Sequence, residues 1–211
     1  MFQNRTEAGK FLAQKLRKEL EDIDLSQVIV LSIPNGGVMI GKVISQDFHC
    51  LHSLILVKKL RSPYEKELAF GSIGLNKNCL YLDQQIYEQL KISESFLKKE
   101  IASRQKILQQ KADFYQLKSI NLQNKIILLV DDGAATGATM ITAIREVKMQ
   151  KPQKIIVALP VLPFDLVNLL KKEVEKLIYL ENPIAFNGVG QFYYQFEQIT
   201  DKQVKTIINS E

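Results

Sequence analysis

The sequence predicts an α/β fold in which a central, Rossmann-like parallel sheet carries helices on both faces. Three observations support this: apolar runs of strand length recur, segments with helical spacing separate them, and the composition is that of a globular chain. The chain has 211 residues, of which 46% are hydrophobic and 24% are charged, as in ordinary folded domains. Near-continuous apolar strands that alternate with helices favour a parallel sheet covered on both faces. One domain over residues 1–211 accounts for the pattern.

The N-terminal half opens with a helix and a buried strand. Leucines at helical spacing predict a helix over residues 6–21. The next apolar run predicts a strand over residues 28–33, which ends at the turn residues 34–37. We then expect a helix, a strand, a polar loop and a pair of strands, at residues 38–45, 54–57, 58–67, 70–73 and 79–82.

The C-terminal half alternates more regularly. Residues 84–120 are predicted to be a mainly helical insertion, whose longest helix spans residues 94–117. Strands are then expected at residues 126–130, 155–159 and 177–180, with helices at 138–149 and 164–172 between them. The segment Thr200-Asp201-Lys202-Gln203 fits a capping box that opens a last short helix.

The charge balance is mildly basic, with 28 Lys and Arg against 23 Asp and Glu. This excess suits an anionic small molecule, and it suits a nucleic-acid surface less specifically. Most of it lies in residues 98–118, where we expect a solvated helix face. The first residues lack the apolar core of a signal peptide, and the apolar runs are too short to span a bilayer. A cytoplasmic protein without a membrane partner is therefore expected.

The cysteines and histidines do not predict a metal centre. Cys50 and Cys79 are too few for a disulfide framework, so we expect reduced thiols. His49, Cys50 and His52 are close together in the sequence but lack a fourth ligand at zinc spacing. No residue is therefore assigned as a direct metal ligand.

The most informative segment is a strand, a loop and a helix over residues 127–139. The strand ends in two adjacent carboxylates, Asp131 and Asp132, and a loop of small residues leads into the helix. Backbone N–H groups that converge at a helix N-terminus bind phosphate, and the hydroxyls of Thr136 and Thr139 can add hydrogen bonds. The acids can accept hydrogen bonds from the vicinal hydroxyls of a sugar. The pattern therefore favours a ribose 5-phosphate.

Other interpretations of this loop are weaker or less specific. It lacks the lysine of a nucleoside-triphosphate P-loop, and its glycines do not have dinucleotide-binding spacing. A helix entry at which Asp and Thr merely act as caps is the alternative without a ligand.

The segment 127–139 resembles the motif of type I phosphoribosyltransferases that binds 5-phosphoribosyl-1-pyrophosphate (PRPP). Segments 2–9, 33–38, 58–60, 67–71 and 131–140 also follow the order seen in a group of bacterial phosphoribosyltransferase-domain proteins. The resemblance implies a phosphoribosyltransferase-type sheet with a small hood built from C-terminal and inserted segments. It implies that the acids hold the ribose 2′- and 3′-hydroxyls and that the loop binds the 5-phosphate. The implied PRPP-binding residues are Asp131, Asp132, Gly133, Ala134, Ala135, Thr136, Gly137, Ala138 and Thr139.

The resemblance also implies a pyrophosphate site. Asn35, Gly36 and Gly37 occupy the family's pyrophosphate-binding loop, although relatives usually carry Arg at the position of Asn35. A plain strand-to-helix turn is the alternative. Lys58 and Lys59 fall in a loop that would close over the pyrophosphate, and with Asp131 and Asp132 they are the candidate catalytic residues. The alternative for these lysines and for Arg61 is a solvated surface. Glu67 would hold a magnesium-bound water or pair with one of these cations.

The acceptor side is implied by the aromatic segment 185–196, within a candidate hood at residues 181–200. Phe186, Phe192 or Tyr193 would stack on a nucleobase, with ordinary packing as the alternative. Relatives that act on 6-oxopurines usually carry Asp where this chain has Ala135, which argues against hypoxanthine, guanine and xanthine.

The implied activity is transfer of a phosphoribosyl group from PRPP, with Mg²⁺, to a nitrogen nucleophile such as a nucleobase, as in nucleotide salvage. Pyrophosphate is released. One alternative is a non-catalytic sensor of PRPP or nucleotides, possible partners of which include nucleic acid or another protein. Another is an accessory protein that binds a different phosphosugar in the same loop. Family members are commonly homodimers.

Overall fold

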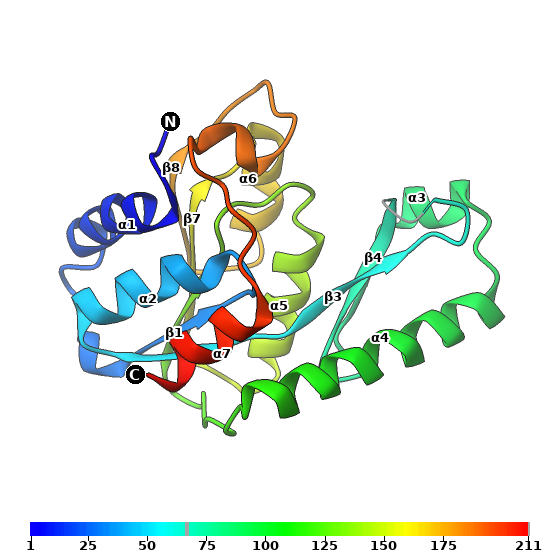
Figure 1. Ribbon diagram of the computed structural model, residues 1–211, viewed down its shortest axis with the longest axis horizontal. Helices are drawn as coiled ribbons and strands as arrows, with labels where there is room; N and C mark the ends of the chain where they lie inside the picture. The colour runs from blue at the N-terminus through cyan, green and yellow to red at the C-terminus, as the bar shows by residue number, and fades with distance from the viewer. Residues whose placement is uncertain (66–67, 211) are drawn as a thin grey trace.

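A five-stranded parallel sheet forms the centre of the computed structural model, which describes residues 1–65 and 68–210. The strand order is β2-β1-β6-β7-β8. Figure 1 shows helices on both faces of this sheet. The strands are β1 (Val28–Ser32), β2 (Leu51–Leu54), β6 (Ile126–Val130), β7 (Lys154–Val161) and β8 (Lys176–Glu181).

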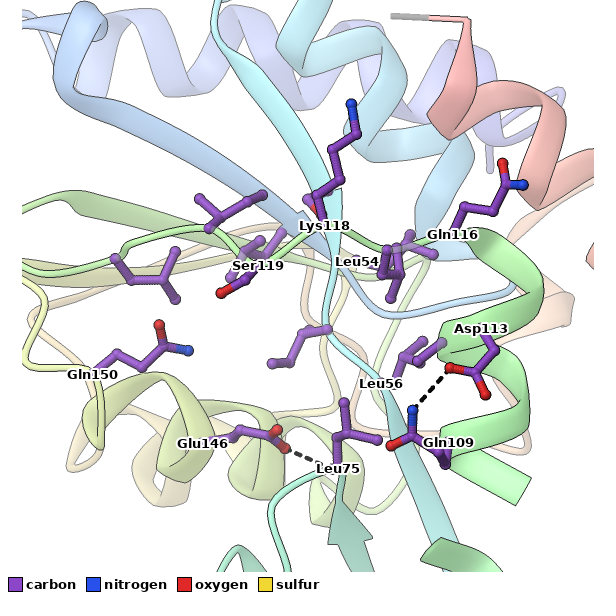
Figure 2. A pocket seen from close by; sticks show the side chains of 17 residues that line it. Leu54, Leu56, Leu75, Gln109, Asp113, Gln116, Lys118, Ser119, Glu146 and Gln150 are labelled. Atoms are coloured by element: carbon purple, nitrogen blue, oxygen red, sulfur yellow. Dashed lines mark hydrogen bonds between the residues drawn. The ribbon is translucent and has the colours of Figure 1, made fainter. Parts of the chain in front are cut away.

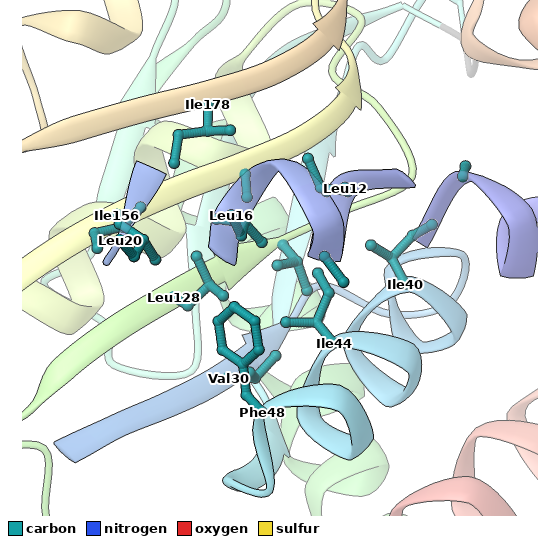
Figure 3. Packing of buried hydrophobic residues seen from close by; sticks show 14 of the residues in the cluster. Leu12, Leu16, Leu20, Val30, Ile40, Ile44, Phe48, Leu128, Ile156 and Ile178 are labelled. Atoms are coloured by element: carbon teal, nitrogen blue, oxygen red, sulfur yellow. The ribbon is translucent and has the colours of Figure 1, made fainter. Parts of the chain in front are cut away.

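The alternation of side chains along each central strand divides the core in two. Val28 and Val30 of β1 pack into the cluster formed with α1 (Arg5–Glu19) and α2 (Gly37–Phe48), as Figure 3 shows for part of that cluster. Ile29 and Leu31 pack on the opposite face, against α5 (Ala138–Lys148) and α6 (Phe164–Lys171). Successive residues of a strand point to opposite faces, and both faces are covered. The strands are therefore apolar throughout.

A second, antiparallel sheet projects from the side of the first. It contains β3 (Val57–Arg61), β4 (Ala69–Gly74) and β5 (Leu80–Leu82), in that order. Helix α4 (Glu94–Tyr115) extends along it, helix α3 (Gln84–Gln89) lies at its outer end, and together they form an arm in Figure 1. Leu60, Phe70 and Leu108 of the arm belong to a third buried cluster. Helix α7 (Asp201–Asn209), Val38 of α2 and Leu54 of β2 also contribute to it.

Most predicted elements are confirmed, including the parallel sheet covered on both faces. The capping box is present, because Thr200 accepts from the backbone N–H of Gln203 while the Gln203 side chain accepts from that of Thr200. The strand predicted at residues 54–57 is wrong, because β2 ends at Leu54 and β3 begins at Val57. The polar loop predicted from residue 58 is also wrong at its start, since residues 58–61 pair with β4.

Three predictions about segments have different outcomes. Residues 84–120 hold α3 and α4, whereas residues 181–200 are mostly irregular, with a short 3₁₀ helix at Val189–Phe192. The assignments of these segments as insertion and hood stay predictions. Glu67 lies outside the described residues.

Over the part of the chain that is described, none of the helices combines the length and the apolar character needed to cross a membrane.

Candidate functional site

The candidate site lies where two neighbouring parallel strands end. Strand β6 ends at Val130 and is followed by Asp131 and Asp132, and β1 pairs directly with β6. The segment after β1 therefore emerges beside the acids, at the carboxyl edge where α/β sheets bind ligands. The backbone N–H of Ile33 donates to the Val130 carbonyl at 3.0 Å, which joins the two loops. The Pro34–Asn35 peptide bond that follows is cis.

Two glycines allow the loop after β1 to touch the acids. A Cβ atom on Gly36 would lie 1.9 Å from Oδ2 of Asp132, and one on Gly37 would lie 2.8 Å from Cα of Asp131. Both distances are shorter than the contacts that Cβ atoms make in proteins, so no larger residue fits without movement. The glycines predicted for the pyrophosphate loop are therefore needed for this close packing, whether or not an anion binds.

Two cavities open beside the acids. The first, of about 190 Å³, follows the loop after β6 and is lined by Lys59, Val189 and most of residues 131–139, Asp132 and Ala138 being the exceptions. The second, of about 340 Å³, lies between the loop after β1 and strand β3, and Lys58, Asp131 and Asp132 contribute to its wall. The structure thus brings the predicted phosphate loop, the acids and the two lysines together.

The N-terminus of α5 closes the first cavity. Gly137 precedes the helix with a φ of 75°, a left-handed conformation that glycine adopts without strain. The backbone N–H groups of the first helical turn have no partners within the helix. Ala135 and Thr136 are exposed at the loop tip, and Thr139 is half-buried. The loop therefore offers backbone and hydroxyl donors to an anion.

The two acids differ in their surroundings. Burial, together with the negative charge of Asp132, raises the pKa of Asp131 well above its usual value. Burial also raises the pKa of Asp132, but Arg5 opposes this shift. Asp131 lines both cavities. It is therefore a half-buried acid whose charge would be stabilised by hydroxyl donors or by a cation.

Arg5 is a site residue that the sequence analysis did not identify. Its Nε donates to Oδ2 of Asp132 at 2.7 Å, and its Nη1 donates to the Glu197 carbonyl at 2.7 Å. The guanidinium also lies 3.8 Å from the centre of the Phe196 ring. A clue was present in the sequence: Arg5 falls four residues before Gly9 on the buried stripe of α1, and a charge on a buried stripe needs a partner.

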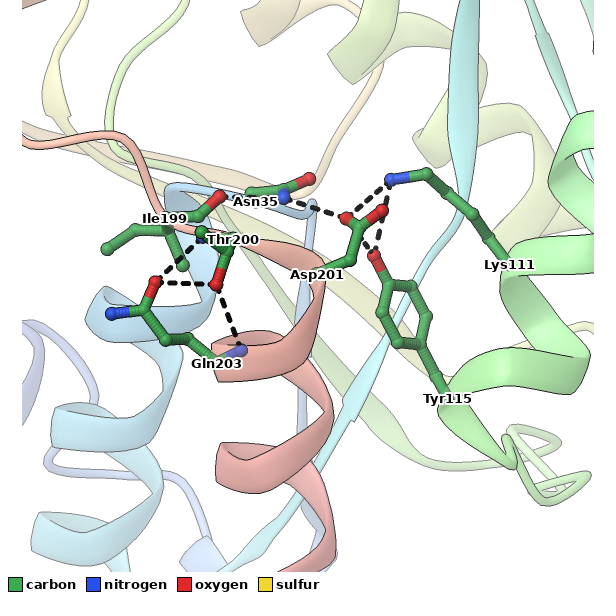
Figure 4. Close-up of polar contacts among 7 residues, drawn as sticks. All are labelled: Asn35, Lys111, Tyr115, Ile199, Thr200, Asp201 and Gln203. Atoms are coloured by element: carbon green, nitrogen blue, oxygen red, sulfur yellow. Dashed lines mark hydrogen bonds and ion pairs between the residues drawn. The ribbon is translucent and has the colours of Figure 1, made fainter.

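Asn35 does not lie as the pyrophosphate prediction requires. Its Nδ2 donates to the Ile199 carbonyl at 2.8 Å and to Oδ1 of Asp201 at 2.9 Å, as Figure 4 shows. An amide nitrogen has two N–H donors, and both are directed to the chain itself. The prediction that the Asn35 side chain donates to pyrophosphate is therefore not supported in this arrangement. The sequence predicted the C-terminal helix but not its contact with Asn35, because Asp201 is 166 residues away in the chain.

Strand β3 places its two lysines differently. Lys58 is half-buried in the second cavity, and Lys59 is exposed beside the phosphate loop. Burial, followed by the positive charges of Lys111 and Arg104, lowers the pKa of Lys58. Both of these cations come from helix α4. The expectation that residues 98–118 present only a solvated face is therefore wrong for Arg104 and Lys111.

The aromatic predictions also change. Tyr193 is buried between Phe2 and Phe196, with ring centres 5.4 Å and 5.1 Å away, and its hydroxyl donates to the Asp132 carbonyl at 2.7 Å. The ring faces are covered, so Tyr193 supports the acid loop and is not placed to stack on a base. Phe186 is half-buried and stacks on Phe192, with 6.1 Å between ring centres. Its predicted base contact stays untested.

A separate cavity of about 590 Å³ lies between the central sheet and the arm. Figure 2 shows leucine side chains on its wall and polar side chains at its rim, among them Glu146, Gln109 and Asp113. None of the predicted site residues lines it. Its wall is made of apolar and polar side chains in about equal parts, and neither the glycine-containing loop nor the acid pair of the sheet edge contributes to it.

Comparison with known proteins identifies a family. The family model described as phosphoribosyl transferase domain matches residues 72–197. A Mycobacterium tuberculosis protein named "Putative phosphoribosyl transferase" is 29% identical over 213 residues, which cover 99% of this chain and 46% of that protein. The chain thus spans about half the length of this relative.

Solved structures show the same fold. A crystal structure of a protein from Thermus thermophilus has a TM-score of 0.80 and 29% identity, over 99% of this chain and 98% of that one. A hypoxanthine phosphoribosyltransferase from Staphylococcus aureus has a TM-score of 0.50 and 12% identity, over 84% of this chain and 74% of that one. The second similarity concerns the fold alone.

Proposed function

We propose, because this chain belongs to the phosphoribosyl transferase domain family, that it binds PRPP with Mg²⁺ and transfers the phosphoribosyl group to a nitrogen nucleophile, a nucleobase in the first instance. In general terms the family supports a transferase that uses PRPP. The acceptor, the metal and the catalytic roles are part of the proposal.

The observation that carries the proposal is that three kinds of ligand-binding group lie together at one edge of the sheet. The loop before α5 offers donors for a monophosphate, Asp131 lies beside it, and the lysines of β3 face both. PRPP has a phosphate at one end, a diol in the middle and a pyrophosphate at the other end. The order of the groups in the protein matches the order of the groups in this ligand.

The reaction follows from this arrangement. The bond between the anomeric carbon and the pyrophosphate oxygen breaks, the acceptor nitrogen bonds to that carbon, and the proton lost by the nitrogen passes to solvent. Positive charge develops on the ribose while negative charge gathers on the leaving group. Asp131 orients the diol and stabilises the positive ribose, and Lys58 and Lys59 stabilise the pyrophosphate. Arg5 positions Asp132.

The residues present fit a magnesium ion that arrives with PRPP. Magnesium is usually held by one or two carboxylates together with substrate phosphates, and Asp131 offers a carboxylate in the wall of both cavities. In residues 1–65 and 68–210 no group of three or more acidic, histidine or cysteine side chains forms a complete site, so the substrate would supply most of the ligands. When bound, the ion neutralises charge on the pyrophosphate.

Ala135 narrows the range of acceptor bases that the proposal allows. This residue is exposed at the loop tip, and its methyl group cannot exchange a proton with a base. The proposal therefore favours acceptors other than 6-oxopurines. Adenine, orotate and uracil are the acceptors to test first.

The test is a pyrophosphate-release assay with PRPP, Mg²⁺ and a panel of nucleobases. Substitution T136A/T139A should weaken PRPP binding about a hundredfold or more, because each hydroxyl bonded to a charged group contributes about 1.5–3 kcal/mol. T206A, on the exposed side of α7, is the matched control and should bind as the parent protein does. If titration calorimetry shows equal PRPP affinity in both variants, the phosphate assignment is wrong.

A non-catalytic PRPP sensor is the second candidate, and one observation favours it. Both amide hydrogens of Asn35 are bonded within the chain, so the loop after β1 lacks a side-chain donor for the leaving group. A sensor should bind PRPP in calorimetry and release no pyrophosphate with any base in the panel. Turnover with one base would exclude it.

A further inference from the structure

We propose that helix α4 supplies two further pyrophosphate-binding residues, Arg104 and Lys111, which act with Lys58 of β3. This inference rests on the proposed function, because it concerns the pyrophosphate end of the same ligand. It assigns a binding role to the arm, which the sequence pattern of a basic helix did not predict.

The two cations lie on one face of α4. They are seven residues apart, which is about two helical turns, and buried Leu108 lies between them. Residues 97, 101, 104, 108, 111 and 115 follow one another at spacings of three and four, so all six share the stripe that faces the third buried cluster. Arg104 and Lys111 are thus directed inward, whereas Lys106 is exposed.

The cavities confirm where these side chains lie. Arg104 lines the cavity of about 340 Å³ beside the acids. Lys111 lines a neighbouring cavity of about 780 Å³, which extends toward the C-terminal segment. Both cavities include Asn35, Gly36 and Lys58 in their walls. The loop assigned to pyrophosphate therefore faces cations from two different elements of the arm.

Each of the two cations is held in place by a carboxylate. The Nε of Arg104 donates to Oε1 of Glu100 at 2.7 Å, and the exposed fractions of these side chains are 22% and 10%. The two Nη atoms of a guanidinium carry four more N–H groups, a fork suited to phosphate oxygens. Glu100 also accepts from the backbone N–H of Arg61. The position of Arg104 is thus fixed relative to β3.

Lys111 is positioned by the C-terminal helix. Its Nζ donates to Oδ1 of Asp201 at 2.7 Å, and the same oxygen accepts from the hydroxyl of Tyr115 at 2.6 Å and from Asn35. Figure 4 shows these groups around one carboxylate. Partial burial opposes the charge of Asp201, but hydrogen bonds from Lys111, Tyr115 and Asn35 outweigh it and lower its pKa to about 2. Asp201 is therefore a fixed anion that orients the ammonium group.

The gathering of like charges indicates an anionic ligand. Lys58, Arg104 and Lys111 are close enough for the last two to lower the pKa of the first. Asp201 attracts Lys58 and offsets part of this repulsion, but burial and the two cations still lower the pKa of Lys58. A polyanion among the three would replace repulsion with attraction. The pyrophosphate of PRPP has the charge and the place to do so.

The test compares ligands that differ at one end. We would titrate PRPP, inorganic pyrophosphate and ribose 5-phosphate, each with Mg²⁺, into the parent protein, R104Q, K111Q and the double variant. We expect each single substitution to weaken PRPP and pyrophosphate about tenfold, the loss typical of one charge-assisted hydrogen bond. Affinity for ribose 5-phosphate should change less than about twofold. K106Q, an exposed lysine on the same helix, should behave as the parent protein does.

Several outcomes would overturn the inference. Unchanged pyrophosphate affinity in the double variant would remove both residues from the site, and an equal loss for ribose 5-phosphate would make their role structural. If R104Q fails to fold because Glu100 loses its partner, E100Q/R104Q removes both charges and serves instead. A parent protein that binds ribose 5-phosphate but not pyrophosphate overturns this inference alone. One that binds pyrophosphate but neither PRPP nor ribose 5-phosphate overturns the proposed function.

Discussion

At Asp131, the environment that suits a ligand also destabilises the folded chain when no ligand is bound. The Asp131 carboxylate is half-buried next to a second carboxylate, and both conditions raise its pKa. A buried charge without full compensation destabilises the folded chain. The backbone N–H of Asp132 donates to its Oδ1 at 2.8 Å, which offsets only part of that effect. A ligand hydroxyl or a magnesium ion would supply the rest.

We therefore expect Asp131→Asn to stabilise the free protein and to abolish tight PRPP binding. Above the usual pKa of 3.8, the unfolded chain has lost a proton that the folded chain keeps on Asp131, because the folded pKa is raised. Stability from this group thus falls as pH rises through that window. The gain from the substitution should grow from pH 4 to pH 7, reaching about 1 kcal/mol as stabilising active-site changes commonly do. Urea unfolding at several pH values measures it.

The exposed acid Asp22 supplies the control for this experiment. Asp22→Asn keeps the same change of charge without the burial, so its effect should be within about 0.5 kcal/mol at each pH. A destabilised Asp131→Asn at neutral pH would mean that the carboxylate is compensated in the folded state, contrary to the pKa argument.

Sequence patterns identified Asp131 and Asp132 but not their partners. Adjacent acids after an apolar strand are a local pattern, which is visible without a fold. Arg5 is 127 residues away from Asp132 in the chain, and Asn35 is 166 residues away from Asp201. Contacts over such separations depend on how the elements pack, so no short segment of the sequence reveals them.

At the level of elements, the strands and helices of the central sheet could be predicted and strand β3 could not. The central strands are buried on both faces, so each is a recognisable apolar run. Strand β3 has the sequence Val-Lys-Lys-Leu-Arg, in which only Leu60 is fully buried. Its extended form comes from pairing with β4. Similarly, the charge of α4 concealed that Arg104 and Lys111 lie on its inner stripe.

The contact between two loops at the sheet edge leads to a prediction about Gly36. In Gly36→Ala the new Cβ would lie 1.9 Å from Oδ2 of Asp132 and 3.0 Å from Nε of Arg5. The loop after β1 must move or the ion pair must shift. We expect a loss of about 1–3 kcal/mol in stability, as for other overpacked sites, and weaker PRPP binding. Thermal unfolding and calorimetry measure these two effects.

Comparing the affinities for two ligands shows whether Gly36→Ala affects only the pyrophosphate loop or the whole site. A shifted pyrophosphate loop should weaken pyrophosphate more than ribose 5-phosphate. Wild-type stability and wild-type affinities in Gly36→Ala would show that the loop has room to relax, and that glycine is not required there.

Across the whole molecule, both ends of the chain converge on the acid loop. The backbone N–H of Phe2 donates to the Phe192 carbonyl at 2.8 Å, and that of Tyr194 donates to the Phe2 carbonyl at 2.9 Å. Tyr193, between these two residues, donates to the Asp132 carbonyl. The C-terminal segment continues to Asn35 and α4 through Asp201. The site is therefore closed by contacts between segments that are remote in the sequence.

Arg5 is the residue on which this closure depends most, since it joins α1 to Asp132 and to the carbonyl of Glu197. The exposed fractions of the Arg5 and Asp132 side chains are only 9% and 13%. Removing one partner of a buried ion pair leaves an uncompensated charge and costs about 3–5 kcal/mol. We expect Arg5→Met to lower the free energy of unfolding by about 3 kcal/mol, measured by urea denaturation, with Lys10→Met on the exposed side of α1 nearly neutral.

The double variant Arg5→Met/Asp132→Asn tells the two roles of Arg5 apart. Once Asp132 is also neutral, it no longer carries a charge that lacks its partner, so most of the lost stability should return. The hydrogen bond from Arg5 to the Glu197 carbonyl is still absent in the double variant. The part of the free energy of unfolding that is not recovered therefore measures how much Arg5 contributes by holding the C-terminal segment. If the double variant were no more stable than Arg5→Met alone, the pairing with Asp132 would be energetically unimportant, and Arg5 would act mainly by holding the C-terminal segment over the acid loop.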